Sequence, residues 1–163
     1  MRSLFVEQAL ANRYINRTWL DIMATLPLAE LDRPQGAFFT SIFGTWNHIL
    51  LGDRIWMARF AGQPNPYTNL RERIAHTFED FRKERSATDD LLVRMMETEQ
   101  DFSRMLVYRN TQGAEFRNPL YQMLSHFFAH QAHHRGQISQ MCHERKIAIP
   151  DGGLIEYYRT AYA

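Results

Sequence analysis

The strongest constraint on the fold is a stretch in the last third of the sequence that holds four of the chain's seven histidines. It reads His126-Phe-Phe-Ala-His130-Gln-Ala-His133-His134-Arg-Gly-Gln137. Pro119 precedes it at a place that suits the first turn of a helix. Pro150 and Gly152-Gly153 stop a helix downstream. We therefore predict one long helix from Pro119 to Arg145.

Helical geometry separates these histidines by direction. With about 100° per residue and His126 as the origin, one apolar face spans about 60° to 160°. His134 at about 80° and His130 at about 40° both point toward this buried side. His126 lies on the edge of the apolar face, and His133, at about −20°, lies outside it. The apolar face consists of Leu120, Met123, Leu124, Phe127, Ile138, Met141 and Cys142.

Two inward-facing imidazoles four residues apart can share one metal ion. A neutral imidazole is a good ligand for Zn, Ni, Fe or Cu. The alternative is that His130 and His134 are ordinary half-buried histidines with hydrogen-bond partners, and their spacing alone does not decide between the two. A third ligand would decide, and the candidates are His48, His76, His143, Cys142 and the carboxylates.

Length and composition place the chain among ordinary folded domains. Its 163 residues suffice for a single domain over 1–163, and 45% apolar with 23% charged residues exclude wholesale disorder. A net charge of +1 without a basic run argues against nucleic-acid binding. The single cysteine excludes an internal disulfide and a CxxC motif. Glu7 and Arg13 interrupt any signal peptide, and no apolar run has membrane-spanning length, so we expect a cytoplasmic protein.

The spacing of apolar residues predicts three further long helices. They cover residues 3–26, Thr40 to Phe60, and Leu70 to Leu106 with a break near residues 86–88. Loops are expected at 27–38 and 61–70, and the segment 106–118 around Asn110–Gly113 is expected to form a small hairpin or an irregular excursion. The apolar segment 154–158 should pack back onto the helices. The predicted fold is all-α, a four-helix bundle with a small hairpin before the last long helix.

The predicted second helix carries a histidine between two glycines. Gly44 and Gly52 stand one turn on either side of His48. Glycine inside a helix costs about 1 kcal/mol relative to alanine, so the pair favours a close approach or room for a ligand, with a plain helix crossing as the alternative. Gly136 is likewise expected to permit close packing. Asp53 points into the apolar face and needs a partner: an arginine from a neighbouring helix, which we prefer, or a metal-bound histidine or water.

In these motifs the chain resembles the DinB family of the DinB/YfiT-like superfamily, which are metal-dependent four-helix proteins. The resemblance covers essentially the whole chain in order, and the H-x-x-x-H-R-G-Q signature is its most specific part. The matching residues are Trp46-Asn-His48-Ile-Leu with Asp53-Arg54-x-Trp56, Tyr108-Arg-Asn110-x-x-Gly113, the stretch from His126 to Gln137, and Leu154-Ile-x-Tyr-Tyr-Arg159.

The resemblance implies one divalent transition metal, Zn, Ni or Fe, bound by His48, His130 and His134. The candidates for residues that orient these ligands by hydrogen bonding are Asp53, His126 and Gln137. An open three-histidine site implies a metal-dependent enzyme in which a metal-bound water or an external thiol does the chemistry.

The activity implied is thiol-dependent S-transferase-like, with a low-molecular-weight thiol as cosubstrate, or hydrolase-like. A non-catalytic metal-binding protein of the stress response is the alternative. The resemblance also implies a homodimer, and we expect no nucleic-acid or membrane partner.

Overall fold

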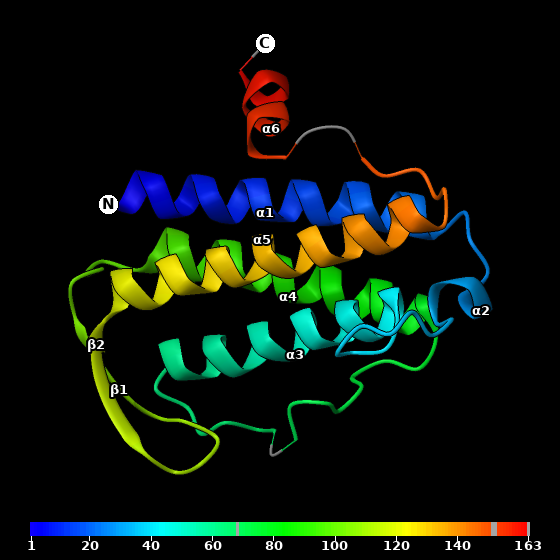
Figure 1. Cartoon of the computed structure of the whole chain (residues 1–163). Coiled ribbons are helices and arrows are strands. Elements are labelled where there is room, and N and C mark those ends of the chain that lie inside the picture. The colour runs from blue at the N-terminus through cyan, green and yellow to red at the C-terminus, as the bar shows by residue number, and fades with distance from the viewer. Residues whose placement is uncertain (68, 151–152, 163) are drawn as a thin grey trace.

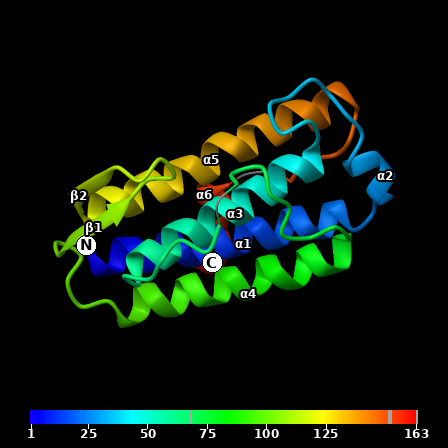
Figure 2. The same ribbon diagram turned by 90° about the horizontal axis from the view of Figure 1, so that it is seen from below.

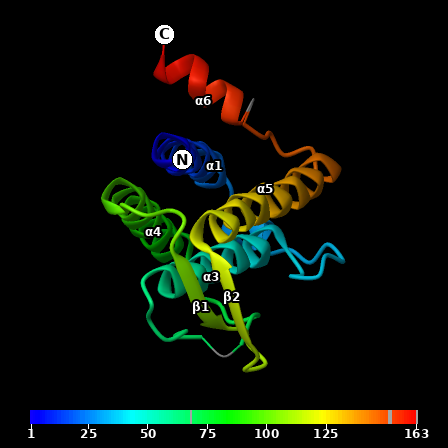
Figure 3. The same cartoon turned by 90° about the vertical axis from the view of Figure 1, so that its left-hand side faces the viewer.

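The structure, a computed structural model, describes residues 1–67, 69–150 and 153–162. It is mostly helical, as predicted. Four long helices run side by side (Figures 1 and 2): α1 (Arg2–Met23), α3 (Ile42–Phe60), α4 (Phe78–Thr98) and α5 (Leu120–Glu144). The short helices are α2 (Leu28–Leu31), within a predicted loop, and α6 (Leu154–Ala161). Viewed end-on, α6 lies outside the four long helices, next to α1 (Figure 3).

The predicted hairpin is confirmed. Strands β1 (Met105–Arg109) and β2 (Glu115–Pro119) pair antiparallel, with Val107 opposite Arg117. The Asn110 side chain accepts hydrogen bonds from two backbone amides of the turn, and Gly113 has φ of 85°, a left-handed conformation that glycine adopts without strain. Pro119 ends β2, with ψ of 145°, so α5 begins one residue later than expected.

The predicted helix from Leu70 to Leu106 is wrong at both ends, and the expected break near residues 86–88 is absent from α4. Helix α4 begins only after Thr77, whose hydroxyl caps the helix by accepting from the Asp80 amide. Upstream, Ala75 donates its amide to the Asn47 side chain instead of to a helical carbonyl. Downstream, Glu99 accepts from the amides of residues 100 and 101, which turns the chain toward β1. Side-chain hydrogen bonds therefore replace helical ones in both flanks.

The apolar interior falls into two clusters along the helices. α1 packs mainly on α4, and α3 mainly on α5. One cluster surrounds Trp46 and Phe81, and the other surrounds Phe60 and Phe127 at the hairpin end. Both are closely packed, since these four side chains are at most 2% exposed. No helix in the described ranges is long and apolar enough to cross a bilayer.

A buried polar layer separates the two apolar clusters. At its centre Arg85 of α4, with no exposed surface, forms ion pairs with Asp53 of α3 and with Asp89 one turn further along α4. This confirms the expected arginine partner for Asp53. Gln131 of α5 also donates to Asp53, and Asn16 of α1 donates to Asp89 at 3.0 Å. The layer therefore joins all four long helices.

Replacing Arg85 with methionine should destabilise the protein strongly. The change keeps the side chain long but leaves two carboxylates buried without their cation, which costs about 3–5 kcal/mol. Urea denaturation measures the free energy of unfolding.

The matched control is Arg82→Met on the same helix. Arg82 pairs with Asp21 at 3.8 Å, and both side chains are about half exposed or more. Its loss should cost less than about 1 kcal/mol. Equal losses for the two variants would contradict a structural role for the polar layer.

Candidate metal centre

His48 of α3 meets His130 and His134, which lie one turn apart on α5. One nitrogen from each of His48, His130 and His134 lies within 4.8 Å of the other two. The Nε2 atoms of His130 and His134 are 3.1 Å apart, and the His48 ring centre lies 4.7 Å from that of His134. No other group of three histidine, cysteine or acidic side chains lies this close in the described part of the chain.

Two of the three rings are oriented from behind through Nδ1. The Gln137 Oε1 atom, one turn further along α5, accepts from His134 Nδ1 at 2.8 Å. The Leu70 carbonyl accepts from His48 Nδ1 at 3.3 Å. These bonds fix the tautomer of each ring and leave Nε2 as the lone-pair nitrogen, which is how protein ligands to metals are commonly held.

The site favours neutral imidazoles. Burial, together with the neighbouring His134, lowers the pKa of His48 to about 4. Burial and the same neighbour lower the pKa of His130 to about 3. Burial also lowers the pKa of His134. All three rings are therefore uncharged at neutral pH, which is the form that binds metal ions.

The two glycines that flank His48 each leave room for a different neighbour. A Cβ atom on Gly52 would lie 3.0 Å from Cε1 of His130, so the absence of a side chain lets this ring pack against α3. A Cβ atom on Gly44 would lie 2.1 Å from the Phe39 carbonyl oxygen. The first contact is the close approach predicted from the sequence, and it brings the two ligand-bearing helices together.

Phe39 covers one face of the site, and the sequence did not identify it. Its ring stacks on His48, with ring centres 3.7 Å apart and planes inclined by 15°. Thr40, next in the chain, has φ of 69°, a conformation unusual for a β-branched residue. Strained backbone of this kind is often found at functional sites. The only sequence signal was the pair Phe38-Phe39, at the end of the predicted loop 27–38 and just before the helix predicted from Thr40. No sequence signal pointed to the Leu70 carbonyl.

The other residues singled out from the sequence lie at different distances from the three histidines. His126 is exposed, and its ring centre lies 6.0 Å from that of His130. His133 is exposed and faces the Gln137 amide. The described hydrogen bonds of Asp53 go to Arg85 and Gln131, so Asp53 supports α5 and not a ligand ring. The remaining candidates for a third ligand stand outside the cluster: His76, Cys142 and His143.

A cavity of about 550 Å³ adjoins His48. It is bounded by the loop before α3, by the loop after residue 68 and by the tip of the hairpin. Its walls include Phe38, Phe39, Leu70, Arg71 and Thr111. The volume is within the usual range for sites that bind small molecules. Of the three clustered histidines, His48 is the one that contributes to the wall of this cavity.

Gly52→Ala should weaken metal binding about 10- to 100-fold, because the new methyl group pushes His130 out of place. The free energy of unfolding should not fall in parallel, since alanine favours a helix by about 1 kcal/mol. Equilibrium competition with a chromophoric chelator measures the affinity.

The matched control is Gly136→Ala in α5, which should leave the affinity unchanged because a Cβ atom there meets nothing within 4 Å. The same observation shows that the expected close packing at Gly136 is wrong. An unchanged affinity for Gly52→Ala would show that His130 does not depend on this contact.

Comparison with known proteins gives a family. The sequence profile of the DinB family matches residues 3–145. None of the curated proteins compared with the chain matches it. Because the matched region is most of the chain and includes the three clustered histidines and Gln137, the protein belongs to the DinB family.

Proposed function

We propose that this protein binds one divalent transition metal, Zn, Ni or Fe, through His48, His130 and His134. The observation that carries the proposal is the convergence of three neutral imidazoles within 4.8 Å. Membership of the DinB family supports the same ligand set.

The residues present fit such an ion. Nitrogen donors suit Zn, Ni and Fe, and Nε2 is the nitrogen left available on His48 and His134 by the bonds at Nδ1. The Leu70 carbonyl and Gln137 hold these two rings, and Gly52 lets the third approach. When bound, the ion supplies Lewis acidity, which lowers the pKa of a coordinated water or thiol.

We further propose that the protein is an enzyme of the thiol-dependent S-transferase-like or hydrolase-like kind. Three protein ligands leave coordination positions for other molecules, which is typical of catalytic centres and not of closed structural ones. The cavity beside His48 provides space for the reacting molecules. Because the only cysteine, Cys142, is buried and absent from the cluster, a thiol cosubstrate would be an external small molecule.

The second candidate is a non-catalytic metal-binding protein of the stress response. Phe39 favours it, because this ring shields one face of His48 and so closes part of the site. The two candidates predict the same metal content but different turnover.

We also propose a domain organisation, a location and an oligomeric state. The chain 1–163 would be one domain with the DinB/YfiT-like four-helix bundle fold, cytoplasmic, without nucleic-acid partners, and a homodimer. The apolar flanks of α3 do not require a partner subunit, since Phe43, Trp46, Leu50 and Met57 are already at most 5% exposed within the single chain.

The purified or reconstituted protein should contain about one equivalent of a transition metal, and His130→Ala/His134→Ala should lose it. Elemental analysis measures the content and names the metal. The control is His133→Ala, which removes an exposed histidine of the same helix outside the cluster and should leave the content unchanged. A metal-free wild type after reconstitution with Zn, Ni and Fe in turn would refute the proposal.

The metal-loaded protein should accelerate the reaction of a small-molecule thiol with an electrophile such as 1-chloro-2,4-dinitrobenzene, or the hydrolysis of an activated ester. His134→Ala should return the rate to the uncatalysed background, because one of the three ligands is missing. Absorbance assays over a panel of thiols and esters follow both reactions. Metal content of one equivalent without turnover of any pair would favour the non-catalytic candidate.

A further inference from the structure

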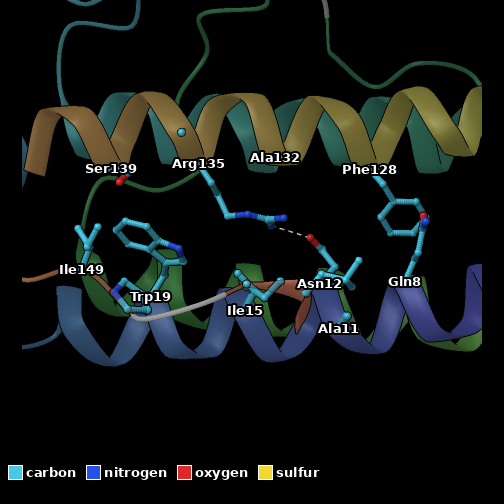
Figure 4. A pocket seen from close by; sticks show the side chains of 14 residues that line it. Gln8, Ala11, Asn12, Ile15, Trp19, Phe128, Ala132, Arg135, Ser139 and Ile149 are labelled. Carbon is cyan, nitrogen blue, oxygen red and sulfur yellow. Dashed lines mark hydrogen bonds between the residues drawn. The ribbon is translucent and has the colours of Figure 1, made fainter. Parts of the chain in front are cut away.

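A second cavity of about 650 Å³ lies between α1 and α5 (Figure 4). It is separate from the histidine cluster, because its wall on α5 is formed by a different face of that helix. Ala132 points about 160° away from His134 around the helix axis. Small residues leave the space open: Ala11 on α1, and Ala132 and Gly136 on α5.

One wall of this cavity carries the Arg135 guanidinium, which forms no direct ion pair in the described part of the chain, although the buried carboxylates of Asp53 and Asp89 attract it electrostatically. Figure 4 shows the Arg135 side chain reaching from α5 across the gap toward Asn12. Its Nη1 atom donates to the side-chain oxygens of Asn12 at 2.7 Å, Asn16 at 3.0 Å and Gln131 at 3.3 Å, all of them neutral amides. The acids of the polar layer pair with Arg85 instead.

The donors on the other side of Arg135 are unused within the described ranges. Arginine has five N–H donors, and no described residue accepts from its Nε or Nη2. No described carboxylate lies within ion-pair distance of it. A carboxylate can accept from two N–H groups of one guanidinium at once, so an anion is complementary to the unused Nε and Nη2 donors of this wall.

The rest of the cavity is suited to an apolar body. From Arg135 toward the end of α1 it is lined by Ile15 and Trp19, and Ile149 lies beside Trp19 (Figure 4). Asn12 and Trp19 are seven residues apart on α1, which corresponds to about 10 Å along the helix. Ile149 is 40% exposed, so a ligand in this position would cover apolar surface that now faces solvent.

We infer that the cavity between α1 and α5 binds a small molecule with a carboxylate head and an apolar tail. The carboxylate accepts from Nε and Nη2 of Arg135, and the tail lies between Ile15, Trp19 and Ile149. This site does not depend on the proposed metal, because the residues that line it and the three histidines are different sets.

Calorimetric titration of the full chain with decanoate, and with decanamide as its uncharged counterpart, tests the site. One decanoate should bind per chain, and decanamide should bind at least about tenfold more weakly. Arg135→Gln should reduce the affinity for decanoate by a similar factor. His130→Ala/His134→Ala should bind decanoate as the wild type does, which separates this site from carboxylate binding to a metal.

Because Arg135 also belongs to the polar layer, Arg135→Gln could lower the affinity for decanoate by destabilising the fold. A second variant that leaves the polar layer intact separates the two effects. Ala132→Leu fills the cavity from an exposed position of α5 and should abolish decanoate binding while the protein stays folded and keeps its metal. The matched control is Ala129→Leu, an exposed alanine of the same helix outside the cavity wall, which should change nothing.

Three results would overturn the inference. They are equal binding of decanoate and decanamide, no binding of either by the wild type, and a change of oligomeric state in Ala132→Leu without any change in decanoate affinity. The last would identify this face as a contact between protein chains.

Discussion

A fully buried guanidinium, that of Arg85, sits where the four long helices meet and fixes how they are arranged. A cation in this position requires carboxylates around it, and Asp53 and Asp89 provide them from α3 and α4. Asn16 from α1 and Gln131 from α5 donate further hydrogen bonds to these two carboxylates. Apolar packing alone would tolerate sliding between helices, whereas this set of directed bonds specifies one register.

Helix α5 relates this polar layer to both candidate sites. Gln131 reaches the layer, while His130 and His134 turn toward α3 and Arg135 turns toward α1. Consecutive residues of one helix thus face three environments: a buried ionic network, a cluster of neutral imidazoles and a cavity. The register set by the polar layer is therefore also the register that places the histidines opposite His48.

The sequence was sufficient for features that depend on local periodicity. The helix holding His130 and His134 follows from apolar spacing, and the hairpin follows from Asn110 and Gly113. The start of α4 was missed because apolar spacing does not reveal that the Asn47 side chain takes the amide of Ala75. Phe39 and the Leu70 carbonyl reach His48 through tertiary contacts. The cavity beside Arg135 depends on the separation of two helices, and no sequence pattern encodes that distance.

Because α5 contributes residues to three different environments, insertions and deletions within this helix should be poorly tolerated during evolution. One inserted residue rotates everything after it by about 100° and shifts it by about 1.5 Å. An insertion before His130 would therefore move all of these groups away from their partners at once. They are the imidazoles of His130 and His134, the Gln131 amide and the Arg135 guanidinium. Insertions and deletions should be tolerated in the connections instead, above all between α3 and α4. There the described residues, 61–67 and 69–77, form neither helix nor strand. Lengthening this connection would reshape the cavity beside His48 and leave the helices that carry the histidines unchanged.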